Sequence, residues 1–126
     1  MTTTEDNKRI VTDYYLTAFA GNPEKAVADH LGDRYIQHNP QAENGPEAFI
    51  GFVHWMRGEY PDTKIEIKRV IAEGDLVVTH SHLVLVPGTP GSAVADFFRL
   101  ENGKIVEHWD VVQEIPETSA NDNTMF

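Results

Sequence analysis

The hydrophobic residues of this 126-residue chain change their spacing halfway along it. In the first half, apolar side chains recur three and four positions apart, which predicts amphipathic helices. From Lys64 onward, apolar and polar residues alternate, which predicts strands with one buried face. A run of helices followed by a run of strands indicates an α+β domain. We therefore expect a single domain over residues 1–126, with a polar tail at 118–126.

The composition excludes several classes of function. The chain carries 10 Lys and Arg against 20 Asp and Glu, a formal net charge of −10, so we expect no nucleic-acid partner. It has no cysteine, which excludes disulfides, thiolate nucleophiles and cysteine metal sites. We find no run of about 18 apolar residues and no apolar signal-peptide core. We therefore expect no membrane partner and a cytoplasmic location.

Residues that begin and end helices divide the first half of the chain. Tyr14 is expected in the core with its hydroxyl at the edge of a cavity, and Trp55 in the core or at an interface. The expected elements are a helix capped by Thr3 or Thr4 and stopped by Gly21, Asn22 and Pro23, a short helix from Glu24 to about Leu31, an extended piece from Tyr35 to His38, and a helix from Pro46 closed by Gly58 and Pro61.

Two tight turns set the expected register of the strands. A turn at Glu73–Gly74 places Ile65 opposite His82 and Ile67 opposite His80. Because the two isoleucines belong in the core, the two histidines are expected to face inward with them.

A second and stronger turn signal, Asn102–Gly103, pairs Asp96 with Trp109. The face that carries Arg99 is polar and is expected to point outward. Asp96, Phe98 and Trp109 are therefore expected inside, on the same side as the histidines.

A carboxylate and two imidazoles on an apolar face must pair with each other, with water or with a ligand, because burying them unpaired is costly. Such a set suits general acid/base chemistry and needs no cofactor. Two alternatives stay open. Each histidine could make an ordinary hydrogen bond in the core, or His80 and His82 could bind a metal with Asp96 or His38 as third ligand.

Three segments carry a family resemblance: RYIQHNP at 34–40, RVIAEGDLVV at 69–78 and GKIVEHWDV at 103–111. With them the chain resembles the SnoaL-like polyketide cyclases. Their cone-shaped α+β fold is shared with nuclear transport factor 2 (NTF2) and ketosteroid isomerase. The resemblance implies a deep pocket for a small apolar or polyketide-like ligand, no metal, no organic cofactor, and a homodimer formed through the outer face of the sheet.

The resemblance also implies that Asp110 is the acid/base aspartate, with Asp96 in place of the partner histidine of the cyclases. Strand alternation puts Asp110 outside unless a β-bulge between Lys104 and Asp110 resets the face, so we keep both aspartates. The catalytic candidates are Asp96, Asp110, His80 and His82, and the candidates for substrate binding are Tyr14, His38, Asn39, Trp55, Phe98, His108 and Trp109.

Three functions remain possible at this point. The first is an enzyme that moves a proton next to a carbonyl of a small, largely apolar substrate, by aldol condensation, cyclisation or isomerisation. Asp96 or Asp110 would be its base, and His80 and His82 its donors. The second is a non-catalytic binding module, and the third a metal-dependent enzyme that uses the two histidines. The tail at 118–126 could fray, or fold over the pocket or a partner subunit.

Overall fold

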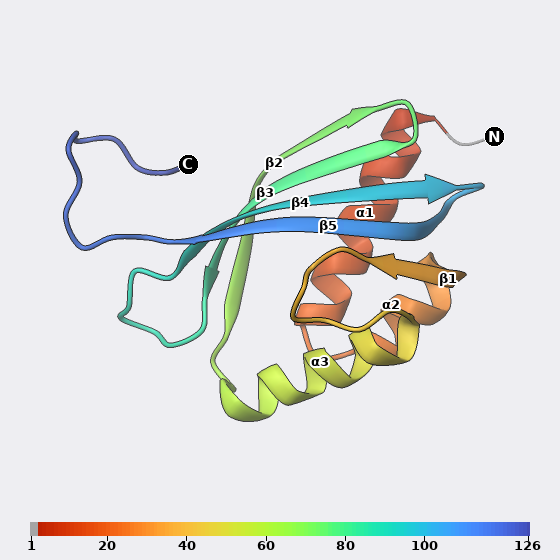
Figure 1. The fold of residues 1–126 in the computed structure, drawn as a ribbon, viewed down its shortest axis with the longest axis horizontal. Coiled ribbons are helices and arrows are strands. Elements are labelled where there is room, and N and C mark those ends of the chain that lie inside the picture. The colour runs from red at the N-terminus through yellow and green to blue at the C-terminus, as the bar shows by residue number, and fades with distance from the viewer. Residues whose placement is uncertain (1–2) are drawn as a thin grey trace.

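Within residues 3–126, which the computed structural model describes, three helices pack against one five-stranded mixed sheet (Figure 1). The strand order is β1-β5-β4-β3-β2, with β1 parallel to β5 and the other neighbours antiparallel. This confirms the α+β class. The elements are α1 (Thr4–Phe19), α2 (Pro23–His30), β1 (Leu31–Gln37), α3 (Pro46–Glu59), β2 (Lys64–Glu73), β3 (Leu76–Val84), β4 (Ser92–Glu101) and β5 (Lys104–Glu114).

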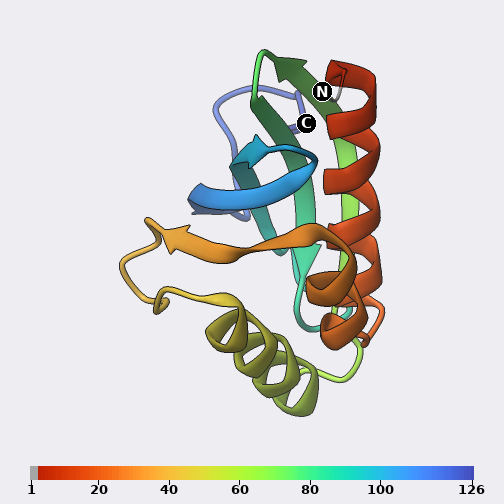
Figure 2. The same ribbon diagram turned by 90° about the vertical axis from the view of Figure 1, so that its right-hand side faces the viewer.

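Helix α1 begins where expected because Thr3 and Asp6 form a capping box. The Thr3 hydroxyl accepts the Asp6 N–H at 3.0 Å, and the Asp6 carboxylate accepts the Thr3 N–H at 3.2 Å. The apolar stripe of α1 is buried and lies against β2 and β3. Figure 2 shows α1 on one side of these strands and the C-terminal segment on the other. The inner face of the sheet is therefore the face that α1 covers.

Strand β1 is longer than the extended piece expected at 35–38. It starts at Leu31, directly after the last turn of α2, whose final hydrogen bond is donated by the Leu31 N–H to Val27. Only Leu31 and Tyr35 of this edge strand are buried. Exposed polar residues between them hid the strand pattern from the sequence.

The prediction that His80 and His82 face inward is wrong. The turn of this hairpin is Gly74–Asp75, one residue later than expected, and the β2–β3 register shifts between Ile67 and Arg69. The shift leaves Lys68 as an extra residue, a β-bulge. A bulge changes which side chains face the core on either side of it.

As a result, the inner face of β3 carries Thr79 and Ser81, both fully buried. Val78, His80, His82 and Val84 lie on the outer face. His80 there accepts a hydrogen bond from the Arg69 guanidinium, and His82 Nε2 lies 2.8 Å from the Pro90 carbonyl oxygen. The alternative in which these histidines bind a metal with Asp96 does not fit this arrangement, because the sheet separates them from Asp96.

The second hairpin turns at Asn102–Gly103 as predicted, with positive φ at both residues (49° and 78°). Its register shifts between Arg99 and Leu100, where Val106 is the extra residue on β5. This is the bulge that the resemblance required. Beyond it the inward face of β5 carries even-numbered residues.

The C-terminal segment runs from β5 across the outer face of the sheet (Figure 1). The ring of Phe126 lies 5.3 Å from the His80 ring and 4.8 Å from the His82 ring, centroid to centroid. The segment therefore packs on the outer face, away from the inner side. No helix among residues 3–126 is long and apolar enough to cross a membrane.

Candidate active site

A cavity of about 260 Å³ lies between the helices and the inner face of the sheet. This is close to the lower end of the range for pockets that hold small organic ligands, about 300–1,000 Å³. Its lining carries carboxylates and one imidazole but, among residues 3–126, no Lys or Arg. The apolar lining is Phe19, Ala42, Ala48, Phe49, Phe52, Leu83, Val94, Phe98 and Val112, and the charged or titratable lining is Tyr14, Tyr15, Tyr35, Glu43, Asp96, His108 and Asp110.

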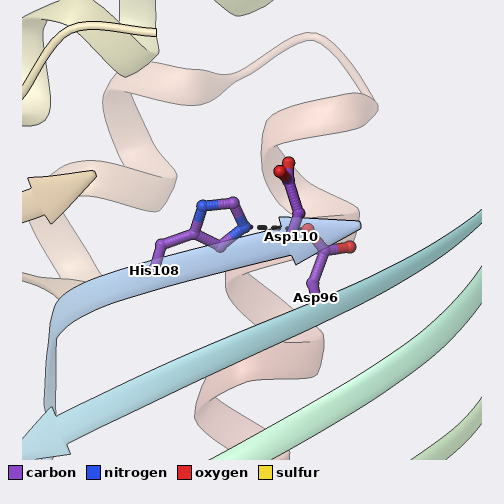
Figure 3. Close-up of side chains that lie close together, drawn as sticks. All are labelled: Asp96, His108 and Asp110. Atoms are coloured by element: carbon purple, nitrogen blue, oxygen red, sulfur yellow. Dashed lines mark hydrogen bonds and ion pairs between the residues drawn. The ribbon is translucent and has the colours of Figure 1, made fainter. Parts of the chain in front are cut away.

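Asp96 is the buried carboxylate of this cavity, with 2% of its surface exposed. The Tyr15 hydroxyl donates to Asp96 Oδ2 at 2.7 Å, and His108 Nε2 lies 2.8 Å from Oδ1 (Figure 3). Burial raises the pKa of Tyr15 well above its usual value, and the charge of Asp96 raises it further. The Tyr15 hydroxyl therefore keeps its proton and stays a donor, so that both oxygens of Asp96 are engaged.

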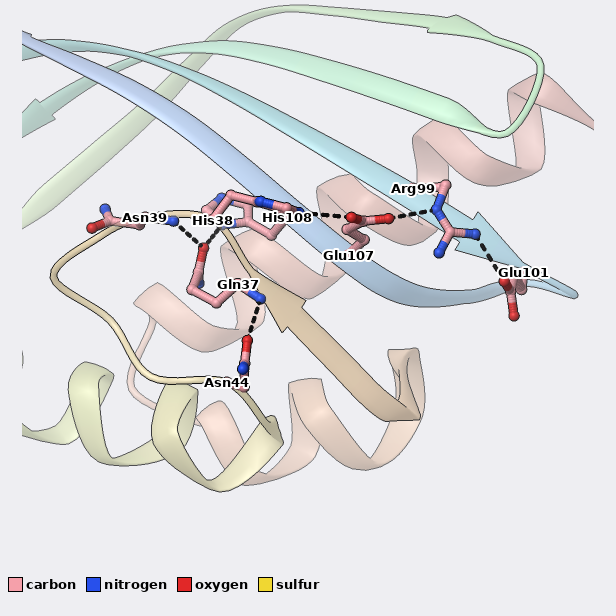
Figure 4. Close-up of polar contacts among 8 residues, drawn as sticks. All are labelled: Gln37, His38, Asn39, Asn44, Arg99, Glu101, Glu107 and His108. Atoms are coloured by element: carbon pink, nitrogen blue, oxygen red, sulfur yellow. Dashed lines mark hydrogen bonds and ion pairs between the residues drawn. The ribbon is translucent and has the colours of Figure 1, made fainter.

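The His108 ring, on β5, contacts Gln37 of β1 and lies between the rings of Tyr35 and Phe98. Its Nδ1 lies 2.7 Å from Gln37 Oε1 (Figure 4), opposite the nitrogen that faces Asp96. The Tyr35 ring stacks on it at 6.2 Å with an interplanar angle of 19°, and the Phe98 ring lies 5.0 Å away. These contacts fix the plane of the imidazole.

Asp110 faces the cavity beside Asp96 because the Val106 bulge makes the two aspartates a cross-strand pair (Figure 3). The Asn39 amide donates to its two oxygens at 2.9 and 3.1 Å. Among residues 3–126, Asn39 is its one hydrogen-bonding partner. The Asp110 carboxylate thus has lone pairs free toward the cavity, whereas each oxygen of Asp96 already has a hydrogen-bonding partner.

Asp96, His108 and Asp110 could each offer one atom to a cation, and these atoms lie within 4.8 Å of one another. However, Nε2 of His108 and Oδ1 of Asp96 are at ordinary hydrogen-bond distance, and one proton between them satisfies both. Because Tyr15 donates to Oδ2, both oxygens of the Asp96 carboxylate have hydrogen-bonding partners and need no metal ion.

The Tyr14 hydroxyl is buried in the same cavity. No partner among residues 3–126 meets strict hydrogen-bond geometry with it, although the Tyr35 side chain lies close enough to interact with it. Burial raises the Tyr14 pKa well above its usual value, and the neighbouring Tyr35 raises it further, so the hydroxyl stays protonated. Because an unpaired buried hydroxyl costs free energy, this group is a donor available to a bound ligand.

Three of the predicted substrate-binding residues lie elsewhere. The His38 ring stacks on Trp109 at 4.8 Å on the outer face, and its Nε2 lies 2.7 Å from a Glu107 oxygen (Figure 4). The bulge at Val106 turned Trp109 outward. Trp55 is 57% exposed on α3 and is not part of the cavity lining. None of these three side chains lines the cavity.

The remaining predicted residues, Tyr14, Asn39, Phe98, His108, Asp96 and Asp110, all line the cavity. The sequence analysis missed Tyr15, Tyr35 and Gln37. Tyr35 and Gln37 precede Asn39 at two-residue intervals, and side chains two apart on an extended chain share a face. That spacing was a usable signal for both.

Solved structures with the same fold have low sequence identity to this chain. TsrD from Streptomyces laurentii superposes with a TM-score of 0.74 at 19% identity, over 89% of this chain and 91% of its own. A proposed polyketide cyclase from Bacillus cereus superposes with a TM-score of 0.73 at 18% identity, over 85% of this chain and 74% of its own. A proposed isomerase of the SnoaL-like family from Agrobacterium tumefaciens superposes with a TM-score of 0.69 at 16% identity, over 85% of this chain and 97% of its own.

A comparison with curated proteins finds no match. The family model of the SnoaL-like domain matches residues 11–108, which include most of α1, all of α2 and α3, β1 to β4 and the first part of β5. Because the match covers more than half of the chain, it shows that the chain belongs to the SnoaL-like family, and the structural relatives share its α+β fold.

Proposed function

We propose that the chain is a cofactor-independent enzyme that removes a proton from the carbon next to a carbonyl of a small, largely apolar substrate. One observation carries this proposal. A carboxylate with free lone pairs, Asp110, lies beside a hydrogen-bonded Asp96–His108 pair in a cavity that is largely but not wholly apolar. Proton transfer by a positioned carboxylate in such a cavity is general base catalysis.

In the proposed reaction Asp110 is the base and Tyr14 the hydrogen-bond donor. An Asp110 oxygen takes the α-proton, and the C–H electron pair moves into an enolate. The Tyr14 hydroxyl donates a hydrogen bond to the enolate oxygen, which stabilises the developing charge. In an isomerisation Asp110 returns the proton to another carbon. In an aldol condensation the enolate carbon attacks a second carbonyl, and the new alkoxide takes the proton.

The charge of the cavity favours an uncharged substrate. Its lining includes Glu43, Asp96 and Asp110 and, within residues 3–126, no basic side chain other than His108. A ligand carboxylate would meet like charges at short range with no partner. The polyketide cyclase and isomerase descriptions of the relatives agree with enolate chemistry.

Deuterium exchange tests the proposal. Uncharged cyclic and aryl ketones are incubated with the protein in D₂O, and loss of their α-proton signals is followed by NMR. We expect exchange with the wild type, at least about 100-fold less with Asp110→Asn, and wild-type rates with the matched control Asp33→Asn, an exposed residue of β1. Ligand binding without exchange in the wild type would contradict the enzyme and support a binding module.

We also infer a homodimer formed through the outer face of β4 and β5. Large apolar side chains are exposed there, with Val111 66% and Phe97 37% accessible beside Trp109. Exposed apolar patches of this kind mark protein interfaces. Native mass spectrometry should find a dimer that Val111→Lys converts to monomer, and a monomeric wild type would contradict this assembly.

A further inference from the structure

We propose that Gln37 is a positioning residue whose single side-chain oxygen holds both carboxylates of the site, Asp96 through His108 and Asp110 through Asn39. Its effect on catalysis rests on the function proposed above. Its effect on where the protons of His108 lie does not, since that is a property of the free protein.

The first step concerns the orientation of the Gln37 amide. The backbone N–H of Asn39 donates to Gln37 Oε1 at 3.1 Å. A backbone N–H can only donate, so the atom that faces it must be the carbonyl oxygen and not the NH₂ group. The orientation of this amide is therefore determined by the chain itself.

The second step concerns the tautomer of His108. Nδ1 lies 2.7 Å from that same oxygen. Because the carbonyl oxygen has no proton to give, Nδ1 must carry one. The nitrogen whose proton can come and go is then Nε2, which faces Asp96 Oδ1 at 2.8 Å.

The third step places the movable proton. Oδ2 of Asp96 is already taken by the Tyr15 hydroxyl, which stays protonated. The mobile proton of the pair therefore lies between Nε2 and Oδ1. The titratable groups around His108 are Asp96 from β4, Asp110 from β5, Tyr14 and Tyr15 from α1, Tyr35 from β1 and Glu43 from the loop before α3.

The fourth step links this pair to Asp110. Asn39, whose N–H bonds to Gln37, uses its own amide to hold Asp110. The Gln37 N–H also donates to Asn44 Oδ1 at 2.8 Å, which ties down the loop between β1 and α3 (Figure 4). The Asn39 side chain is also held by the Gln41 N–H, which donates to Asn39 Oδ1 at 2.8 Å. Removing the Gln37 oxygen therefore removes the acceptor of His108 Nδ1 and one of the two bonds that hold Asn39 beside Asp110.

The test uses ¹⁵N NMR of the histidine rings in the free protein. Gln37→Met keeps the length of the side chain but loses the amide oxygen, and Gln113→Met is the matched control on an exposed position of β5. In the wild type and the control we expect neutral His108 to carry its proton on Nδ1. In Gln37→Met neutral His108 should populate the Nε2–H form. Deprotonation of Nδ1 in the wild type, or an unchanged tautomer in Gln37→Met, would overturn the proposal.

A second variant covers the case in which Gln37→Met does not fold. Gln37→Glu keeps an acceptor for both donors, so neutral His108 should carry its proton on Nδ1 as in the wild type. An Nε2–H tautomer in this variant contradicts the proposal. Where exchange activity exists, Gln37→Met should lower it at least about tenfold, because misplaced catalytic groups lose rate steeply. Absence of exchange in the wild type would contradict the proposed function, but it would not affect the conclusion on the His108 tautomer from NMR.

Discussion

Asp96 and Asp110 lie directly opposite each other on neighbouring strands, yet their partners differ. Asp96 is held by a tyrosine hydroxyl and an imidazole, and Asp110 by one amide group. A carboxylate with two strong donors is stabilised in place, whereas one with open lone pairs is free to accept a proton. This asymmetry assigns support to Asp96 and proton transfer to Asp110.

Exchanging each aspartate for asparagine should separate these two roles. Asp110→Asn is expected to abolish exchange activity while the free energy of unfolding changes by no more than about 0.5 kcal/mol. Asp96→Asn should lower the unfolding free energy by about 1–3 kcal/mol, because it disturbs a buried hydrogen-bonded set. Urea unfolding monitored by circular dichroism measures both. A larger stability loss in Asp110→Asn than in Asp96→Asn would reverse the assignment.

Tyr14→Phe should trade function for stability. The variant removes a buried hydroxyl that has no partner of strict hydrogen-bond geometry among residues 3–126, so we expect an unfolding free energy equal to or up to about 1 kcal/mol above that of the wild type. Exchange activity should fall at least tenfold, by about 1.4 kcal/mol of lost transition-state stabilisation. Tyr60→Phe is the matched control, because Tyr60 directly follows α3 and does not line the cavity. A clear loss of stability in Tyr14→Phe would show that the hydroxyl is paired in the fold.

Because Tyr15 and Tyr35 are buried, we expect the protein to lose stability at alkaline pH. Burial raises the pKa of Tyr15 and of Tyr35 above the ordinary value of 10.0. The folded state therefore holds these protons more tightly than the unfolded state, so the stability they contribute is present below pH 10 and is lost as pH rises above it. Urea midpoints measured from pH 8 to 11 should fall steeply, and less steeply in Tyr35→Phe. Parallel pH profiles for the two proteins would contradict this.

Glu107 predicts the opposite dependence at acid pH. Hydrogen bonds from Arg99 and then His38 lower the Glu107 pKa below its usual 4.5. Its contribution is therefore present above pH 4.5 and is lost as pH falls through the lowered value. At pH 7, Glu107→Gln should lose about 0.5–1 kcal/mol, the upper range for ion pairs near the surface, and the difference should vanish near pH 3. Glu117→Gln in the exposed tail should follow the wild type at both pH values.

The elements of the fold were largely predictable because their signals are local. Thr3 caps α1, Pro46 begins α3 and Asn102–Gly103 turns the last hairpin, each through its own backbone chemistry. The faces of the strands were not predictable in the same way. They depend on two extra residues, Lys68 and Val106, and neither residue type signals a bulge.

The candidate site shows the same division. Asp96 and Phe98 precede the Val106 bulge and face the cavity as alternation predicted. Trp109 lies beyond it and faces the other way. Asp110 was retained only through the resemblance of the segment around it to a family. The error at His80 and His82 had a physical cause as well, since Ile65 and Ile67 lie on the far side of the other bulge.

The bulge at Val106 makes the site sensitive to the length of this hairpin. Loss of one residue between Ile105 and Glu107 would restore simple alternation and carry His108 and Asp110 together to the outer surface, with Trp109 turned into the cavity. Gain of one residue at the same point would do likewise. Among natural variants of this chain, insertions and deletions in β5 should therefore be selected against more strongly than any exchange of side chains on its outer face.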